Sequence, residues 1–282
     1  MKKIYLCLTN RFIMRTYLIL LAIIYSVFTT LYAQEKEHIV LISTNKGDMK
    51  VKLYNNTPRH RDYFLNLARK GYFDDTLFGR VIQQFIIQGG SQDSRGVKPG
   101  SRIGDGDRTM EIPHELRAEN LPKKGAVGCP RRDVKFNPKK DSDMSMFFIV
   151  EGRTYTQGQL DTLELIKNVP IKKKIREKLY PPVKPMLDSL RVADPRAYNA
   201  YVRDFNHRLD SLTRATPGSL TFTPEERAAY TTVGGSLHLK EEYTIFGEVI
   251  DGLDVIEKIS SIPTNAYDRP NEDVIMKVKV IQ

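Results

Sequence analysis

Apolar and polar residues alternate along several short stretches near both ends of the chain. Two such runs between residues 38 and 54 are separated by Asn45, Lys46 and Gly47, a pattern typical of a β-hairpin. Further strand-like runs lie at residues 78–90, 144–150, 243–250 and 273–281. Both ends of the sequence are therefore predicted to be rich in β-strand.

Two segments within these β-rich parts have helical spacing. In "TPRHRDYFLNLARKG", Thr57 is predicted to supply an N-cap oxygen, Pro58 fits the first turn and Gly71 ends the helix. The segment "GLDVIEKIS", residues 252–260, predicts a second helix just before the last strand.

The middle of the chain is different. Between residues 157 and 229 the apolar residues recur at helical spacing, and "TPEERAAY" predicts a short helix capped by Thr223. Five prolines are expected to break the segment into several helices: Pro170, Pro181, Pro182, Pro185 and Pro195. We therefore predict a helical insert at residues 151–236, between β-rich parts at 34–150 and 237–282.

The first 33 residues have the pattern of a secretory signal peptide. Basic residues precede the apolar run "YLILLAIIYSVF", and a stretch of small residues ends at Ala33 before a charged segment. The run is shorter than the roughly 20 residues of a membrane span, so a retained membrane anchor is the less favoured interpretation. No stable span is expected after cleavage. We expect cleavage after Ala33, export to the periplasm and a translation start at either Met1 or Met14.

Charge and cysteine content narrow the functional classes. The chain has 282 residues and a net charge of +10, which falls to +6 without the four basic residues of the predicted signal peptide. This mild excess is not typical of a nucleic-acid-binding protein. Of the two cysteines, only Cys129 lies beyond the signal peptide, so no internal disulfide is expected.

The segment "FGRVIQQFIIQGG", residues 78–90, places an arginine and a glutamine in an otherwise apolar strand pair that ends in two glycines. Together with "KKGAVGCP", "SMFFIV" and "EYTIFGEVIDGLDVIEKI", it resembles the motifs of the cyclophilins, which are peptidyl-prolyl cis/trans isomerases, in the family's order. The resemblance covers nearly all of the sequence outside the insert. It implies a closed eight-stranded antiparallel barrel capped by two helices, with the α-helical insert as an addition.

The resemblance also implies a substrate site for X-Pro segments of unfolded or exported proteins. Arg80 would be the catalytic residue that hydrogen-bonds the prolyl amide, and Gln88 would hold the substrate backbone. Phe85 and Phe148 would form the floor and wall of the proline pocket, and Leu239 would close one side. The remaining substrate-binding positions implied are Ile86, Arg131, Met146 and Tyr243. No cofactor and no metal are expected.

Several positions depart from the family's pattern. Met146 stands where the family has glutamine, and Pro130 with Arg131 replaces an alanine–asparagine pair, so altered substrate binding and weak affinity for the family's cyclic-peptide inhibitor are expected. Tyr243 replaces a histidine and keeps a ring with a polar tip. Further changes are Gly79, in place of a histidine outside the pocket, and His238, where a tryptophan often lies.

Other functions are weaker interpretations of the same residues. A non-catalytic module that binds proline-containing segments would share the pocket, although the presence of Arg80 favours an enzyme. The histidines lack the spacing of metal ligands, and the glycines from residue 89 to residue 106 lack the Gly-Lys-Ser/Thr of a phosphate loop. The helical insert could be a decoration or an arm that contacts client chains.

Overall fold

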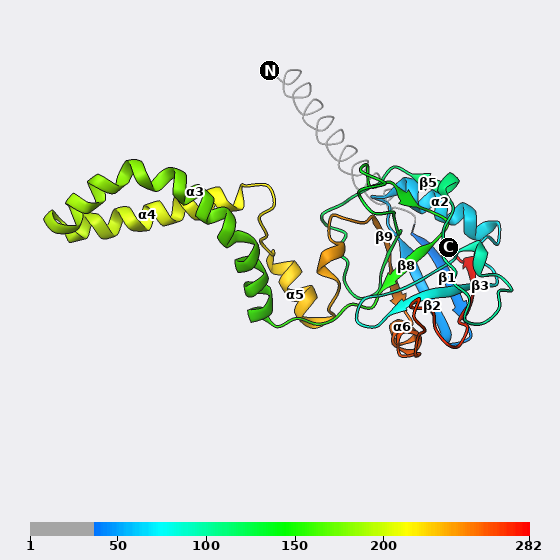
Figure 1. Ribbon diagram of the computed structural model, residues 1–282. Helices are drawn as coiled ribbons and strands as arrows, with labels where there is room; N and C mark the ends of the chain where they lie inside the picture. Colours follow the sequence, from blue (N-terminus) through cyan, green and yellow to red (C-terminus); the bar gives the residue numbers. More distant parts are fainter. Residues whose placement is uncertain (1–36) are drawn as a thin grey trace, which may run out of the picture. The chain divides into compact units, whose positions relative to one another are not determined.

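Eight antiparallel strands form a closed barrel in the computed structural model, which describes residues 37–282 (Figure 1). Around the barrel the strands follow the order β1 (His38–Thr44), β10 (Ile275–Val280), β3 (Thr76–Ile82), β4 (Ile86–Gly89), β8 (Phe147–Val150), β6 (Ala126–Gly128), β9 (Ile245–Asp251) and β2 (Gly47–Leu53). The predicted fold class is confirmed. The predicted signal peptide and its start codon lie outside the described residues.

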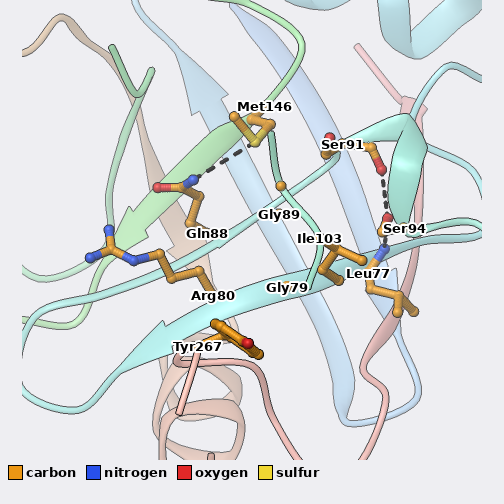
Figure 2. Close-up of a pocket in the computed structure, with 11 residues that line it drawn as sticks. Leu77, Gly79, Arg80, Gln88, Gly89, Ser91, Ser94, Ile103, Met146 and Tyr267 are labelled. Atoms are coloured by element: carbon orange, nitrogen blue, oxygen red, sulfur yellow. Dashed lines mark hydrogen bonds between the residues drawn. The ribbon is translucent and has the colours of Figure 1, made fainter. Parts of the chain in front are cut away.

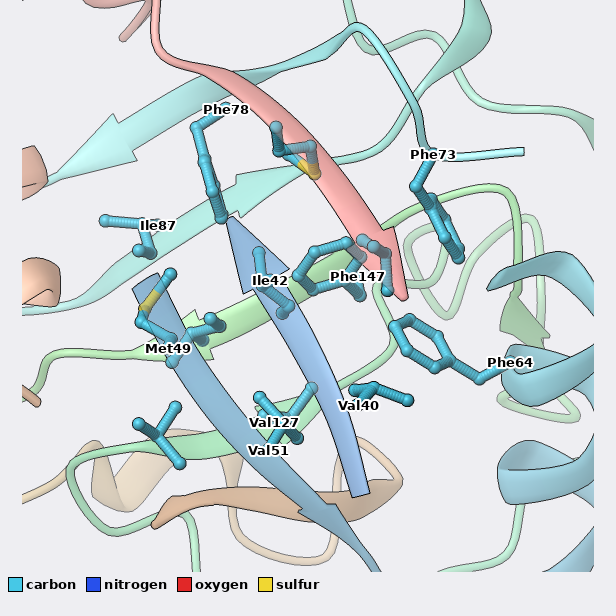
Figure 3. Packing of buried hydrophobic residues seen from close by; sticks show 14 of the residues in the cluster. Val40, Ile42, Met49, Val51, Phe64, Phe73, Phe78, Ile87, Val127 and Phe147 are labelled. Carbon is cyan, nitrogen blue, oxygen red and sulfur yellow. The ribbon is translucent and has the colours of Figure 1, made fainter. Parts of the chain in front are cut away.

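Alternation of side chains separates the barrel interior from its outer surface. Val40 and Ile42 of β1, Ile87 of β4 and Phe147 of β8 are all fully buried in one apolar core (Figure 3). On each strand, the residues that alternate with these buried ones point outward. On β4 this places Ile86 and Gln88 on the outer face, which carries a second, smaller apolar cluster.

Helices α2 (Pro58–Arg69) and α6 (Leu253–Ser260) are the two helices predicted from the β-rich parts. Each turns its apolar face into the barrel core, which is where Phe64 of α2 stacks on Phe73 at 4.9 Å between ring centroids. The prediction that Thr57 caps α2 is wrong, because its hydroxyl donates to the Tyr54 carbonyl.

The start of α2 is capped instead by a side chain from a distant loop. The Glu115 carboxylate accepts the backbone N–H groups of Arg59 at 3.3 Å and His60 at 3.0 Å, and it also contacts the buried His60 ring at 2.8 Å. A carboxylate satisfies two unpaired N–H groups and opposes the positive end of the helix dipole. It therefore serves better here than the Thr57 hydroxyl.

Short elements lie between the barrel strands in sequence. These are η1 (Gln92–Ser94), η2 (Arg108–Met110), η3 (Leu237–Leu239) and the two-stranded sheet of β5 (Glu111–Ile112) and β7 (Ser142–Asp143). Among the described residues, no helix has the length and apolar character needed to cross a membrane.

The helical insert consists of α3 (Gln157–Ala193), α4 (Pro195–Arg214) and α5 (Pro224–Thr232). Thr223 caps α5 as predicted, through a capping box with Glu226. The insert does form several helices, and Pro195 begins α4 as a predicted break. The predicted breaks at Pro170, Pro181, Pro182 and Pro185 are wrong, because all four lie inside α3. Most of α3 around residues 181–186 is exposed, so water can satisfy carbonyls that lose their partner there, and the helix bends (Figure 1).

Two contacts bury the apolar faces of the insert. The apolar residues that recur at helical spacing along α4 pack on α3. Leu209 of α4 and Leu187 of α3 are buried, and the Phe205 ring of α4 lies 6.2 Å from the Tyr180 ring of α3. A small separate core lies nearer to the barrel. It consists of Leu160 of α3, Tyr230 of α5 and Phe222, which precedes α5. Leu237 of η3 packs against this second core.

Candidate active site on the outer face of the barrel

One groove of about 540 Å³ lies on the outer face of the barrel. All nine residues predicted for the substrate site line it: Arg80, Phe85, Ile86, Gln88, Arg131, Met146, Phe148, Leu239 and Tyr243. They come from β3, the β3–β4 turn, β4, β8, η3 and three loops. The structure thus brings together residues that are up to 163 positions apart, although their individual roles remain predictions.

Strand register explains how the central residues meet. Arg80 of β3 is the register partner of Gln88 on β4, and Gln88 is the partner of Phe148 on β8. Directly paired residues project from the same face of a sheet. A cation, an amide and an aromatic ring therefore form one row across three strands.

The groove has an apolar floor. Phe148, Leu239 and Ile86 are 1%, 2% and 3% exposed and belong to the outer apolar cluster, against which Phe85 and Tyr243 also pack. The Tyr243 ring meets the Phe148 ring edge-on at 5.9 Å. This combination of a few aromatic and aliphatic side chains is suited to holding a proline ring.

Arg80 is the charged group at the edge of this floor. Its side chain is 45% exposed, and its Nε lies 3.3 Å from the Asp268 carboxylate. Among the hydrogen bonds between described residues, none uses its two terminal nitrogens. Because a guanidinium stays protonated at working pH, these nitrogens are permanent donors available to a ligand.

Met146 takes part in positioning Gln88. The Gln88 amide nitrogen points at the Met146 sulfur, 3.7 Å away, as Figure 2 shows. A thioether is a weak acceptor, so this contact orients the amide less firmly than the glutamine implied by the resemblance. The amide oxygen of Gln88 remains available to a substrate backbone.

Arg131 is more constrained than the sequence suggested. Its guanidinium lies 4.8 Å from the centre of the Tyr243 ring and donates from Nη2 to the Glu242 carboxylate at 2.7 Å. Its Nε and Nη1 donate to backbone carbonyls. These three hydrogen bonds fix the guanidinium, and Arg131 in turn holds the Tyr243 ring in place.

Six further residues line the groove: Gly104, Asp105, Pro130, Arg132, Asp143 and His238. Two of them, Pro130 and His238, are among the predicted departures from the family's pattern, and the other four were not predicted. Asp143 accepts the backbone N–H of Ser145 at 2.9 Å, and burial raises the pKa of its carboxyl. Burial lowers the pKa of His238, whose ring lies 4.7 Å from that of Phe85.

The glycine-rich loop reaches the groove because of its backbone. Asp93 accepts the N–H groups of Gly104 and Asp105 at about 3 Å, which fixes the loop. Gly106 has a φ of 74°, and a Cβ there would lie 2.2 Å from an Asp143 oxygen. The run of glycines was visible in the sequence, but its proximity to the groove was not.

A smaller cavity of about 50 Å³ adjoins the groove beneath Arg80 (Figure 2). Gly79 lines this cavity, and a Cβ at that position would lie 2.6 Å from the Ile103 side chain. Gly79 therefore gives Ile103 room to pack against β3. Gly79 does not line the groove itself, which agrees with its expected place outside the pocket.

The barrel and its groove define a protein that can hold an extended peptide across three strands, with an apolar pocket beside a fixed cation. Within residues 37–282 no group of His, Cys, Asp and Glu side chains is arranged to hold a metal ion. The residues that line the groove offer hydrogen bonds, charge and apolar contact.

Comparisons with known proteins identify the family. The model described as "Cyclophilin type peptidyl-prolyl cis-trans isomerase/CLD" matches residues 39–175 and 223–280. A Staphylococcus aureus (strain USA300) protein named "Putative peptidyl-prolyl cis-trans isomerase" is 27% identical over 245 residues, which are 86% of this chain and 91% of that protein. The chain therefore belongs to the cyclophilin-type peptidyl-prolyl cis-trans isomerases and is an isomerase of that class.

Other similar proteins differ more in length or sequence. A Streptococcus pyogenes serotype M6 protein named "Putative bifunctional phosphatase/peptidyl-prolyl cis-trans isomerase" is 27% identical over 84% of this chain but only 37% of its own length. Crystal structures of a Cryptosporidium parvum cyclophilin type isomerase, one of them in the presence of the dipeptide Ala-Pro, have TM-scores of 0.49 and 0.48. They are 20% and 19% identical and cover 88% and 86% of this chain and 99% of their own.

Proposed function

We propose that this protein catalyses cis/trans exchange of X-Pro bonds in unfolded segments of exported proteins, with Arg80 as the catalytic residue. The observation that carries the proposal is the register row of Arg80, Gln88 and Phe148 over one groove. The predicted signal peptide supports the assignment of exported proteins as substrates.

The chemical demand of this reaction is small. Amide resonance opposes rotation with a barrier of about 18 to 20 kcal/mol, and uncatalysed X-Pro exchange takes roughly 10 to 100 s. A turnover of about 10 per second requires the barrier to fall by roughly 3 to 4 kcal/mol. One charge-assisted hydrogen bond contributes about 1.5 to 3 kcal/mol, so a donor and a dry pocket can together meet the demand.

Each group in the row has a part in this mechanism. The terminal nitrogens of Arg80 donate to the prolyl amide and disfavour its resonance, because a hydrogen bond to the amide nitrogen withdraws its lone pair from the carbonyl. Phe85, Phe148 and Leu239 grip the proline ring while the preceding carbonyl turns. Gln88 holds the substrate backbone through its free amide oxygen. No proton is transferred.

The remaining groove residues support binding. Ile86 belongs to the apolar floor, Tyr243 forms one wall, and Arg131 keeps that wall in place. Met146 orients Gln88. We assign residues 34–150 and 237–282 to the isomerase domain and residues 151–236 to an inserted helical unit.

Exchange spectroscopy of an X-Pro tetrapeptide tests the proposal. In the presence of the protein without residues 1–33, the cis and trans proton signals should exchange at rates proportional to protein concentration. A peptide that binds, as judged by its chemical shifts, without any acceleration of exchange would identify the groove as a binding module rather than an active site.

A further inference from the structure

A loop near the C-terminus presents a carboxylate to the proposed catalytic arginine. Asp268 lies 188 positions from Arg80 in sequence, yet its Oδ2 accepts a hydrogen bond from Arg80 Nε at 3.3 Å. Each side chain is 45% exposed. Because Nε is the only nitrogen of Arg80 that is hydrogen-bonded among the described residues, the two terminal nitrogens keep their donors for a ligand.

The backbone around Asp268 is fixed by local hydrogen bonds. Asn265 accepts the N–H of Asp268 at 3.1 Å through its carbonyl, and its side-chain oxygen accepts the N–H of Tyr267 at 2.8 Å. The Asp268 carbonyl in turn accepts the N–H of Val81, the residue after Arg80, at 2.8 Å. The loop is thus attached to β3 directly beside the arginine that it contacts.

A buried arginine anchors the same loop from behind. Arg269 is 1% exposed and donates to the carbonyls of Lys98 at 3.1 Å and Ser101 at 2.8 Å and to the Asp273 carboxylate at 2.7 Å. A buried guanidinium with several acceptors is costly to displace. The position of Asp268 relative to Arg80 is therefore set by the fold and not only by two mobile side chains.

We propose that Asp268 is a positioning residue, which holds the Arg80 side chain through Nε so that its terminal nitrogens face the prolyl amide. This inference rests on the proposed function for its catalytic consequence, but the orientation of Arg80 can be observed without any substrate. Arginine side chains lose much rotamer freedom when fixed, so an arginine already held in place pays less of that cost in the transition state.

A second effect of Asp268 acts in the opposite direction. A carboxylate beside Arg80 partly offsets the positive charge that the prolyl amide experiences. Since both groups are half-exposed, solvent screens this effect, and an exposed ion pair corresponds to a change of about five-fold at most. Substitutions that separate hydrogen-bonding geometry from charge decide between the two effects.

The backbone conformation at Asp268 determines which substitutions are suitable. Its φ is 58°, in the left-handed region that Asn and Gly adopt readily. Asp268→Asn keeps the acceptor oxygen and removes the charge, while Asp268→Gly removes both without strain. Asp75→Gly is a matched control, because Asp75 also has a positive φ, 62°, and a surface ion pair, with Lys277.

Two readouts are measured on the protein without residues 1–33 and on these three variants. The first is kcat and KM for exchange of an X-Pro tetrapeptide. The second readout is measured by NMR on the Arg80 Nε–Hε group in the free protein. It consists of the rate at which Hε exchanges with water and the order parameter of the Nε–Hε bond. We expect Asp268→Gly to lower kcat by about two- to five-fold with little change in KM, and to speed exchange of Hε. Asp268→Asn should keep kcat at or above the wild-type value and Hε ordered.

The outcomes separate this inference from the proposed function. If the Arg80 Nε–Hε bond is as ordered in Asp268→Gly as in the wild-type protein, the positioning role is overturned. It is also overturned if Asp75→Gly loses as much kcat as Asp268→Gly. A rise of kcat in both Asp268 variants shows that charge attenuation is the larger effect and also overturns it. If the wild-type protein catalyses no exchange, the proposed function fails, and the Hε measurement alone then supports or overturns the role of Asp268 in holding Arg80.

Discussion

At the scale of single residues, the proposed mechanism uses no group that gains or loses a proton. Arg80 stays charged, and the contacts of Phe148 and Leu239 do not depend on pH. His238 is the titratable ring on the groove floor, and burial lowers its pKa from the ordinary value of 6.5. Protonation of His238 is not part of the proposed mechanism.

This chemistry predicts the pH dependence of catalysis. Between about pH 6.5 and 8, kcat/KM for a tetrapeptide without ionisable side chains should be nearly constant, unlike the bell shape of acid–base catalysis. The measurement is tetrapeptide exchange by NMR at several pH values and constant ionic strength. A steep change near neutrality would contradict the mechanism and point to proton transfer by His238 or Asp143.

The predictability of the site also differs from residue to residue. Arg80 and Gln88 could be identified because one long motif, over two strands adjacent in sequence, contains both. Phe148 could be identified because it belongs to a second motif of the same family. The contact between Asp268 and Arg80 could not be predicted, because the two residues are far apart in sequence. It depends on how the loop that carries Asp268 packs against β3. Likewise, Gly104 and Asp143 line the groove only because Gly106 allows the loop to approach.

At the scale of elements, periodic patterns predicted the strands and helices that have one apolar face. The termini of α3 and α2 were harder to predict. Prolines suggested breaks in α3, but an exposed helix can bend and leave carbonyls to water. Thr57 had the right residue type for a cap, yet Glu115 from another loop provides stronger charge-assisted hydrogen bonds.

The capping role of Glu115 predicts a loss of stability on substitution. Although burial raises it, hydrogen bonds from the His60 ring and the N–H groups of Arg59 and His60 hold the pKa of Glu115 below its ordinary value. Glu115→Gln should lower the free energy of unfolding at pH 7 by about 1 to 3 kcal/mol. The reason is that these donors would then face a neutral amide instead of a charged carboxylate. Urea denaturation measures this loss.

Glu119→Gln is the matched control for this experiment, since Glu119 lies on the same loop and is exposed, with a hydrogen bond to Asn56 at 3.1 Å. Its substitution should change stability by no more than about 0.5 kcal/mol. Equal stabilities of the Glu115 and Glu119 variants would mean that α2 does not depend on the carboxylate cap.

At the scale of the whole molecule, the helical insert is joined to the groove through one short element. Leu239 of η3 lines the groove, whereas Leu237 packs on the small core formed by Leu160, Phe222 and Tyr230. Lys240 also contacts Glu226 of α5 at 2.5 Å. The insert therefore supports one wall of the groove, and deletion of the complete insert is expected to disturb the groove as well.

Exposed apolar residues on α3 allow a narrower test of whether the insert contacts client chains. Leu165, Ile166 and Val169 are 60%, 64% and 54% exposed. They lie on one side of the helix and do not belong to either core. Replacing all three by Ser should leave tetrapeptide exchange unchanged but slow the proline-limited refolding of a whole protein, if the insert is a client-binding arm.

The control for this variant replaces Ile275 and Ile281, which are 46% and 50% exposed on the barrel, by Ser. This change should affect neither assay. Refolding catalysis that survives the triple substitution would show that this face of the insert does not bind clients and would favour a decoration.

The central claim is that Arg80 accelerates rotation about the prolyl bond, and Arg80→Ala tests it most directly. The variant should lose roughly 1.5 to 3 kcal/mol of transition-state stabilisation, about ten- to a hundred-fold in kcat/KM for tetrapeptide exchange. Arg102→Ala removes an equally charged but more exposed side chain, paired with Asp105, and should remain at the wild-type rate. Equal exchange rates for the wild-type protein and Arg80→Ala would contradict the claim.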